Sequence, residues 1–205
     1  MIARTQQAGS FRRAVTRAAS CCALALVAAP VVAGCGSIRA GGPAVGTSGG
    51  KAPVANCSAS RLRVTLDVHA AGAAAGSSFV PLDFTNISGR ACRLAGYPVV
   101  SFAAGASGHR VGRAAALDRT VKVRSVALAP GATAHSWVQV VDALNFPVSK
   151  CHPVTAHGFR VDLPGQRGTS FVNHAFPACS ASMHGRQILT VQPIEPGRAR
   201  RGTAQ

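Results

Sequence analysis

The sequence predicts an all-β domain, an antiparallel β-sandwich of about seven or eight short strands. Apolar and polar residues alternate with a period of two, for example at Leu62, Val64, Leu66 and Val68, and no segment gives a convincing helical pattern. Turn residues separate the alternating segments. Four cysteines lie in the same region, and bridges between sheets are common staples of exported sandwich domains.

The first half of this region is expected to contain strands over residues 62–68, 79–84, 90–94 and 98–102. Pro81 has no N–H to donate, which predicts an edge strand or a bulge. Asn86-Ile-Ser-Gly89 is typical of a turn, because the Asn86 side chain can bond to the backbone two residues on. Gly96 interrupts the strand pattern.

The second half begins with Val121, Val123, Val126 and Leu128, which predict a strand with a slip in phase. Ala129-Pro-Gly-Ala132 is typical of a type II turn, because proline presets φ at its second position and glycine supplies a positive φ at its third. Further strands are expected over 133–142, 159–163, 170–172 and 188–191. In the first of these, Trp137 lies on the face opposite Val138 and Val140 and is expected to be exposed.

The amino-terminal residues 1–34 are interpreted as a lipoprotein signal peptide. A leader with four arginines precedes an apolar run over 18–33, about 16 residues, which is too short to span a bilayer but suits a signal peptide. Val31-Val-Ala-Gly-Cys35 resembles the bacterial lipoprotein signal at every position, so Cys35 is the expected lipidation site. The alternatives are an uncleaved membrane helix and a plain secretory signal. Arg12-Arg13 fits a twin-arginine export signal poorly, which favours ordinary export.

The mature chain is therefore expected at the extracytoplasmic face of the cell membrane, anchored by its lipid. Residues 35–56 read as the lipidated cysteine and a Gly/Pro/Ser-rich tether with a reach of about 25 Å. Residues 57–193 form the predicted β-sandwich domain. Residues 194–205 are expected to be a basic, disordered tail.

Four cysteines remain in the domain once Cys35 is assigned to lipid. An even number in an exported chain indicates two disulfides, and Cys57, Cys92, Cys151 and Cys179 allow three connectivities. We favour the pairing of neighbours, Cys57 with Cys92 and Cys151 with Cys179. A zinc site needs closely spaced cysteine pairs, and this sequence has none.

The chain is strongly basic, with 22 Lys and Arg against 6 Asp and Glu and a net charge of +16. Inside a cell this excess would indicate nucleic acid. Outside the cytoplasmic membrane, a basic surface meets anionic head groups and phosphate- or uronate-bearing wall polymers. The expected partners are therefore the membrane, through the lipid on Cys35, and an envelope protein or anionic wall polymer, with no nucleic acid.

Candidate chemistry is sparse, and no catalytic residue, cofactor or metal site is predicted. Asp67 and Asp83 lie on predicted strands, where either can pair with an arginine on the solvent face. Trp137, His152 and His184 are the candidate ligand contacts. Imidazoles in an exported sandwich make copper or small-ligand binding the alternative function. An envelope hydrolase is a weaker alternative, because no spacing indicates a carboxylate pair.

A series of short motifs gives a resemblance. Cys57-Ser-Ala-Ser-Arg-Leu, Cys92-Arg-Leu-Ala-Gly-Tyr-Pro98, Leu128-Ala-Pro-Gly131 and Pro177-Ala-Cys179 occur in this order. Together they resemble the domain-of-unknown-function family 4232 of actinobacterial secreted proteins and lipoproteins. The resemblance covers about residues 57–193 and implies an immunoglobulin-like β-sandwich with the two favoured disulfides. It implies no activity, so the expected function is a non-enzymatic binding or structural domain of the cell envelope.

Overall fold

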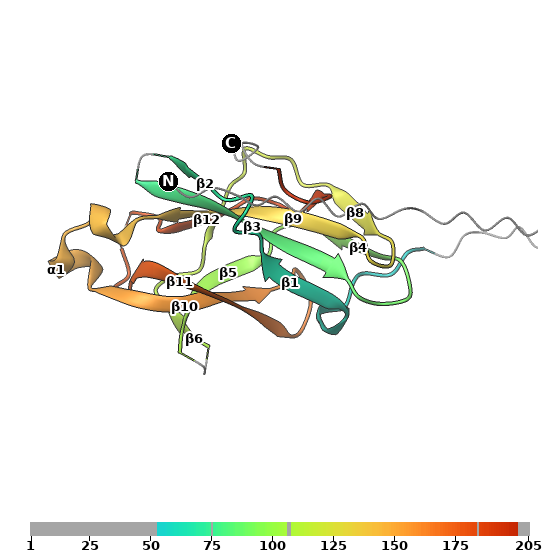
Figure 1. The fold of residues 1–205 in the computed structure, drawn as a ribbon, viewed down its shortest axis with the longest axis horizontal. Helices are drawn as coiled ribbons and strands as arrows, with labels where there is room; N and C mark the ends of the chain where they lie inside the picture. Colours follow the sequence, from blue (N-terminus) through green and yellow to red (C-terminus); the bar gives the residue numbers. More distant parts are fainter. Residues whose placement is uncertain (1–52, 75, 106–107, 184, 201–205) are drawn as a thin grey trace, which may run out of the picture. The chain divides into compact units, whose positions relative to one another are not determined.

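A computed structural model describes residues 53–200 except 75, 106, 107 and 184. The described part is all-β, as predicted, and consists of two larger sheets and one two-stranded ladder (Figure 1). The two larger sheets pack face to face, because apolar side chains from both meet in one core. Within the described residues, no helix has the length and apolarity needed to cross a membrane.

The first sheet is mainly antiparallel and centres on two long strands. In order across the sheet, its strands are β1 (Leu62–Leu66), β3 (Ser77–Asn86), β9 (Thr133–Val141), β12 (Leu189–Val191) and β7 (Ala116–Leu117). β2 (Gly72–Ala74) pairs with β3, and β13 (Glu195–Pro196) pairs with β9. Only the contact between β12 and β7 is parallel among these pairs. The sheet therefore combines local hairpin pairing with strands distant in sequence.

The second sheet is antiparallel and lies against the first. Its order is β11 (Thr169–Cys179), β10 (Pro153–Asp162), β5 (Val99–Ala104) and β6 (His109–Val111). The separate ladder joins β4 (Cys92–Ala95) to β8 (Ser125–Leu128). In the described part of the chain, helical residues are limited to η1 (Ala59–Arg61), η2 (Ala143–Asn145) and the single turn α1 (Val148–Cys151).

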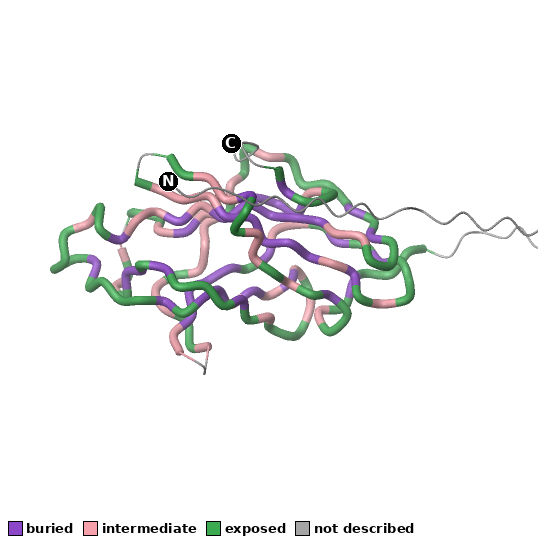
Figure 2. The backbone as a smooth tube through the Cα atoms, in the orientation of Figure 1, coloured by how far each residue is buried: buried purple, intermediate pink, exposed green. Residues whose placement is uncertain are grey.

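The core lies between the two larger sheets (Figure 2). Leu82, Phe84 and Val138 enter it from the first sheet and are essentially inaccessible to solvent. Phe159 from the second sheet stacks on Phe176, with their ring centroids 4.5 Å apart. Phe102 also contacts Phe159, at 5.7 Å. Stacked rings of this kind add to the stabilisation from burial alone, by about 0.5–1.5 kcal/mol per pair.

The prediction that Pro81 marks an edge strand or a bulge is wrong for β3, which lies between β1 and β9. Pro81 pairs with Trp137 in an unbroken antiparallel register. Its carbonyl oxygen accepts a hydrogen bond from the Asp67 N–H at 3.0 Å, so its polar backbone groups face the β1 side. There β1 has ended at Leu66 and β2 begins only at Gly72. Pro81 therefore faces the first residue after β1, Asp67, whose carbonyl accepts from the Ala70 N–H at 3.3 Å, so the missing proline N–H leaves no acceptor unpaired.

The prediction of a strand with a phase slip over residues 121–128 is right only for its second part. Ser125–Leu128 form β8, whereas Val121 and Val123 lie in the preceding loop and Val123 is 50% exposed. The change of phase therefore marks the start of the strand. The strands that the sequence did not predict, among them β2, β7 and β13, have only two or three residues each. Such short segments carry too few residues to display a period.

Both predicted turns are present, and the Asn86 side chain connects them. The Ala132 N–H bonds to the Ala129 carbonyl at 3.0 Å, and Gly131 has a φ of 76°, as a type II turn requires. The Asn86 side chain is fully buried. Its amide donates to the carbonyls of Arg90 and Leu128, at 2.9 and 3.0 Å, and its Oδ1 accepts from the Ser88 N–H. The residue therefore joins the turn after β3 to the end of β8.

The two disulfides pair neighbouring cysteines, as favoured from the sequence. Cys57 bonds to Cys92 and fastens the start of the domain to β4. Cys151 bonds to Cys179 and fastens the end of α1 to the end of β11. Both bonds are buried.

The prediction of a disordered tail from residue 194 is wrong for residues 194–200. Ile194 is fully buried, and its N–H bonds to the Gly96 carbonyl at 2.9 Å. Glu195 and Pro196 pair with β9, and the Gly197 N–H bonds to the Thr133 carbonyl at 3.0 Å. The apolar Ile194 supplies core contact and so extends the domain past residue 193. Residues 201–205 lie outside the described part.

Candidate functional site

The expectation that Trp137 is exposed is wrong, because this side chain is only 2% accessible. Its face was predicted correctly: Val138 and Val140 point into the core, and Trp137 points to the outer side of the first sheet. Ala70, Ala199 and Phe79 pack with it there. The loop after β1 and the segment 194–200 supply this cover, so Trp137 is not available as an exposed ligand contact.

The other candidate ligand contacts do not form a site among the described residues. His152 is exposed and has the left-handed backbone conformation, with a φ of 47°. Its carbonyl accepts hydrogen bonds from the backbone and the side chain of Ser180, at 3.2 and 2.8 Å. His184 and Cys35 lie outside the described residues. The described residues contain no group of three or more His, Cys, Asp or Glu side chains that could hold a metal ion.

A buried carboxylate lies under the segment 194–200. Asp83, on β3, is 1% exposed, and its Oδ2 accepts a hydrogen bond from Arg198 Nη1 at 2.7 Å. Its Oδ1 has no hydrogen-bond partner in the described part of the chain. Burial raises the pKa of Asp83 above its usual value, and the Arg198 guanidinium acts in the opposite direction. The predicted arginine partner is therefore present, but the carboxylate is covered and does not lie on a solvent face.

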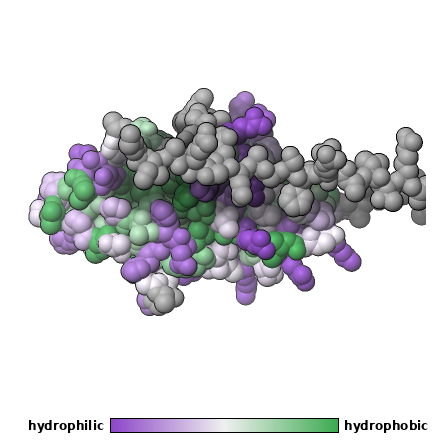
Figure 3. Space-filling view, in the orientation of Figure 1, coloured by the Kyte–Doolittle hydropathy of each residue, from purple (hydrophilic) through white to green (hydrophobic). Residues whose placement is uncertain are grey.

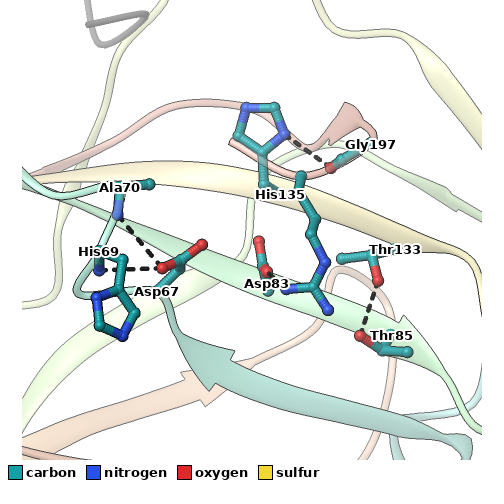
Figure 4. A network of polar contacts seen from close by, with 9 residues as sticks. Asp67, His69, Ala70, Asp83, Thr85, Thr133, His135 and Gly197 are labelled. Carbon is teal, nitrogen blue, oxygen red and sulfur yellow. Dashed lines mark hydrogen bonds and ion pairs between the residues drawn. The ribbon is translucent and has the colours of Figure 1, made fainter. Parts of the chain in front are cut away.

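His135, the cross-strand neighbour of Asp83, holds the same segment from β9 (Figure 4). Its Nδ1 donates to the Gly197 carbonyl at 3.0 Å, and its Nε2 lies 3.9 Å from Glu195 Oε2. The ring also meets Trp137 edge-on, with centroids 6.3 Å apart. These contacts engage both ring nitrogens of the imidazole, which therefore holds the segment 194–200 against β9.

The chemistry of this cluster is structural. The hydroxyls of Thr85 and Thr133 flank Asp83 and bond to each other at 2.9 Å (Figure 4), so neither is paired with the imidazole as a nucleophile would be. Asp67, on the other side, accepts hydrogen bonds from the backbone N–H groups of His69 and Ala70. Sequence reasoning found Asp83 as an arginine acceptor. It missed His135 as a structural group, because nothing local to His135 shows that residues 194–200 return to it.

All six acidic side chains of the protein are used in internal contacts. Asp118 accepts from the Thr120 backbone and side chain, and these bonds hold its pKa below the usual value. Asp142 caps the η2 turn through the Leu144 N–H. The remaining contacts are those of Asp67, Asp83 and Glu195 above and of Asp162 with Arg160 and Thr169. The carboxylates are thus committed to the fold.

The basic side chains are mostly uncompensated. Among the described residues, His135, Arg160 and Arg198 lie within 4.0 Å of a carboxylate. Exposed side chains without such a contact include Arg61, Arg63, Arg90, Arg93, Arg119 and Arg124. Figure 3 shows hydrophilic side chains interspersed with apolar ones on the face it presents. The surface therefore carries a distributed positive charge that the protein does not neutralise itself.

The fold and these contacts define a class of protein: a β-sandwich domain with two disulfides and a basic surface. The chain belongs to the family described as "Domain of unknown function (DUF4232)", whose model matches residues 57–195. This confirms the resemblance found in the sequence. No curated protein and no solved structure matches the chain.

Proposed function

We propose that this protein is a non-enzymatic lipoprotein whose domain, an immunoglobulin-like sandwich, is displayed outside the cytoplasmic membrane and binds an anionic wall polymer. The observation that supports this proposal is the different use of acidic and basic side chains. Every acidic side chain is engaged in internal contacts, whereas many arginines are exposed and unpaired. Such a surface attracts polyanions over a distance of about one Debye length, roughly 8 Å at physiological salt.

The lipid anchor rests on Val31-Val-Ala-Gly-Cys35, which lies outside the described residues. Acyl chains on Cys35 would keep the domain at the membrane, since two chains give stable anchoring where one is marginal. Fractionation of cells that express the Cys35→Ala variant tests this. We expect the wild-type chain in the membrane fraction and the variant in the soluble extracytoplasmic fraction. Cys21→Ala/Cys22→Ala is the matched control and should remain with the membrane; membrane retention of Cys35→Ala would exclude the lipid anchor.

Polymer binding is tested by sedimentation of the full chain, in non-ionic detergent, with isolated cell walls. The bound fraction should fall as salt is raised, because screening weakens exposed charge contacts. Walls treated with cold hydrofluoric acid, which cleaves phosphodiester-linked polymers, should bind much less. Binding that is independent of salt and unaffected by this treatment would overturn the polymer proposal and favour a protein partner.

A further inference from the structure

One hollow of the surface combines exposed arginines with a rigid frame. It has a volume of about 510 Å³ and is lined by residues before and in η1, by the turn after β3 and by the start of β4. Arg61 and Arg90 line it, and Asn56, Ser58 and Gly89 line it as well. No acidic residue lines it. It therefore presents two positive groups and several hydrogen-bonding groups toward one space.

The backbone around the hollow is fixed, although the arginine side chains are free to reach a ligand. The Arg61 carbonyl accepts from the Ile87 N–H at 2.9 Å, and the Arg90 carbonyl accepts from the buried Asn86 amide at 2.9 Å. Two further backbone hydrogen bonds and the Cys57–Cys92 disulfide hold the first residues of the domain against β4. Because the backbone frame is ordered before any ligand arrives, binding loses little backbone conformational entropy.

The chemistry of the hollow suits a phosphate group. A guanidinium binds phosphate oxygens through parallel, charge-assisted N–H···O bonds, and two arginines at one hollow can engage both free oxygens of a phosphodiester. The volume exceeds that of a single phosphate, and the methyl groups of Ala55 and Ala91 line it as well. The groups that flank a phosphodiester in a polymer therefore have room and apolar contact.

The position of the hollow favours a ligand close to the membrane. Ala55 and Asn56 line it, and they are the last two residues of the predicted tether that begins at Cys35. That tether has an expected reach of about 25 Å. We infer that the hollow between Arg61 and Arg90 is the binding site for a phosphodiester unit of a membrane-proximal wall polymer. This inference rests on the proposed function and assigns its polymer-binding site.

The test compares two variants of equal charge. Arg61→Gln/Arg90→Gln removes both guanidinium groups from the hollow, and Arg119→Gln/Arg124→Gln removes two exposed arginines that do not line it. Neither arginine of the hollow forms an ion pair, so thermal unfolding should be unchanged. Calorimetric titration of the full chain with a short poly(glycerol phosphate) should show binding weakened about tenfold or more in the first variant and less than about threefold in the second.

The outcomes separate the two proposals. Equal weakening by both variants would overturn the assignment to this hollow and leave general attraction to a basic surface. Failure of the wild-type chain to bind either the oligomer or isolated walls would overturn the proposed function itself. Polygalacturonate binding as tightly as poly(glycerol phosphate), with the same loss in Arg61→Gln/Arg90→Gln, would overturn the phosphate assignment. Hollow-dependent binding only to anionic phospholipid vesicles would replace the wall polymer by the membrane surface.

Discussion

Replacing Arg198 by alanine should destabilise the domain through Asp83. The substitution removes the one side chain that, among the described residues, bonds to the Asp83 carboxylate, which is 1% exposed. A hydrogen bond to a charged group contributes about 1.5–3 kcal/mol. The Arg198 side chain is 65% exposed, so solvent screens part of its interaction. We therefore expect a loss of about 1–2 kcal/mol in the free energy of unfolding at neutral pH.

The loss should depend on pH in a definite direction. Burial raises the pKa of Asp83, so the folded state binds this proton more tightly than the unfolded state does. Stability from this group is therefore present in acid and is lost as the pH rises from the unfolded pKa through the folded pKa. Arg198 opposes the shift, so its removal widens that window. The variant should approach wild-type stability as Asp83 becomes protonated.

Urea denaturation followed by tryptophan fluorescence measures this at neutral and acidic pH. Arg167→Ala is the matched control, because it removes an exposed arginine that has no ion pair. In an Asp83→Asn background, Arg198→Ala should cost much less, because the buried charge that it pairs with is absent. An undiminished cost in that background, or at acidic pH, would refute the role assigned to the pair.

Three further predictions concern the fold. Asn86→Ala leaves buried carbonyls without a donor and should cost about 3 kcal/mol, measured by urea denaturation. Gly158→Ala places a methyl group against the Val172 carbonyl and should cost about 2–3 kcal/mol in the same assay. Trp137 is the single tryptophan and is buried, so the native protein should emit at short wavelength with little quenching by iodide. Deleting residues 194–205 should shift that emission to the red.

Each of these has a contradicting result. Wild-type stability of Asn86→Ala would mean that the two turns are independent of its side chain. Gly72→Ala is the control for Gly158→Ala, because its added methyl group meets nothing within 4 Å; equal costs would contradict the close approach of β10 and β11. Strong iodide quenching of native Trp137 would contradict its cover by residues 194–200.

Local pattern predicted much of the fold because each long strand sends alternate apolar residues into the core. The alternation through Ala134, Ser136, Val138 and Val140 placed β9 correctly and assigned its core face. The Asn86 and Pro130-Gly131 turns were predicted because their chemistry depends on neighbours in sequence. Tertiary pairing was beyond such reasoning. Pro81 lies in an interior strand because two short strands share its edge, and no local signal shows that arrangement.

The site was predicted less well than the fold for the same physical reason. Alternation showed which face of β9 carries Trp137, but the cover on that face comes from Ala70 and Ala199, which are distant in sequence. Likewise, Asp83 was expected to meet an arginine, and the partner lies in a segment predicted to be disordered. The hollow at Arg61 and Arg90 forms only when β1, β3 and β4 are assembled. The spacing of residues along the chain does not show which distant residues come into contact.

Because residues 194–200 cover the outer face of the first sheet, that cover forms late in the making of the chain. Asp83 and Arg198 are 115 residues apart in sequence. If the chain is exported from its amino terminus, β3 and β9 reach the outside long before the segment that covers Trp137 does. During that interval the outer face of the first sheet presents an open apolar and carboxylate surface, which is a natural target for extracytoplasmic chaperones and proteases. The outer face of the first sheet is therefore covered only once residue 199 is in place, because Ala199 packs on Trp137.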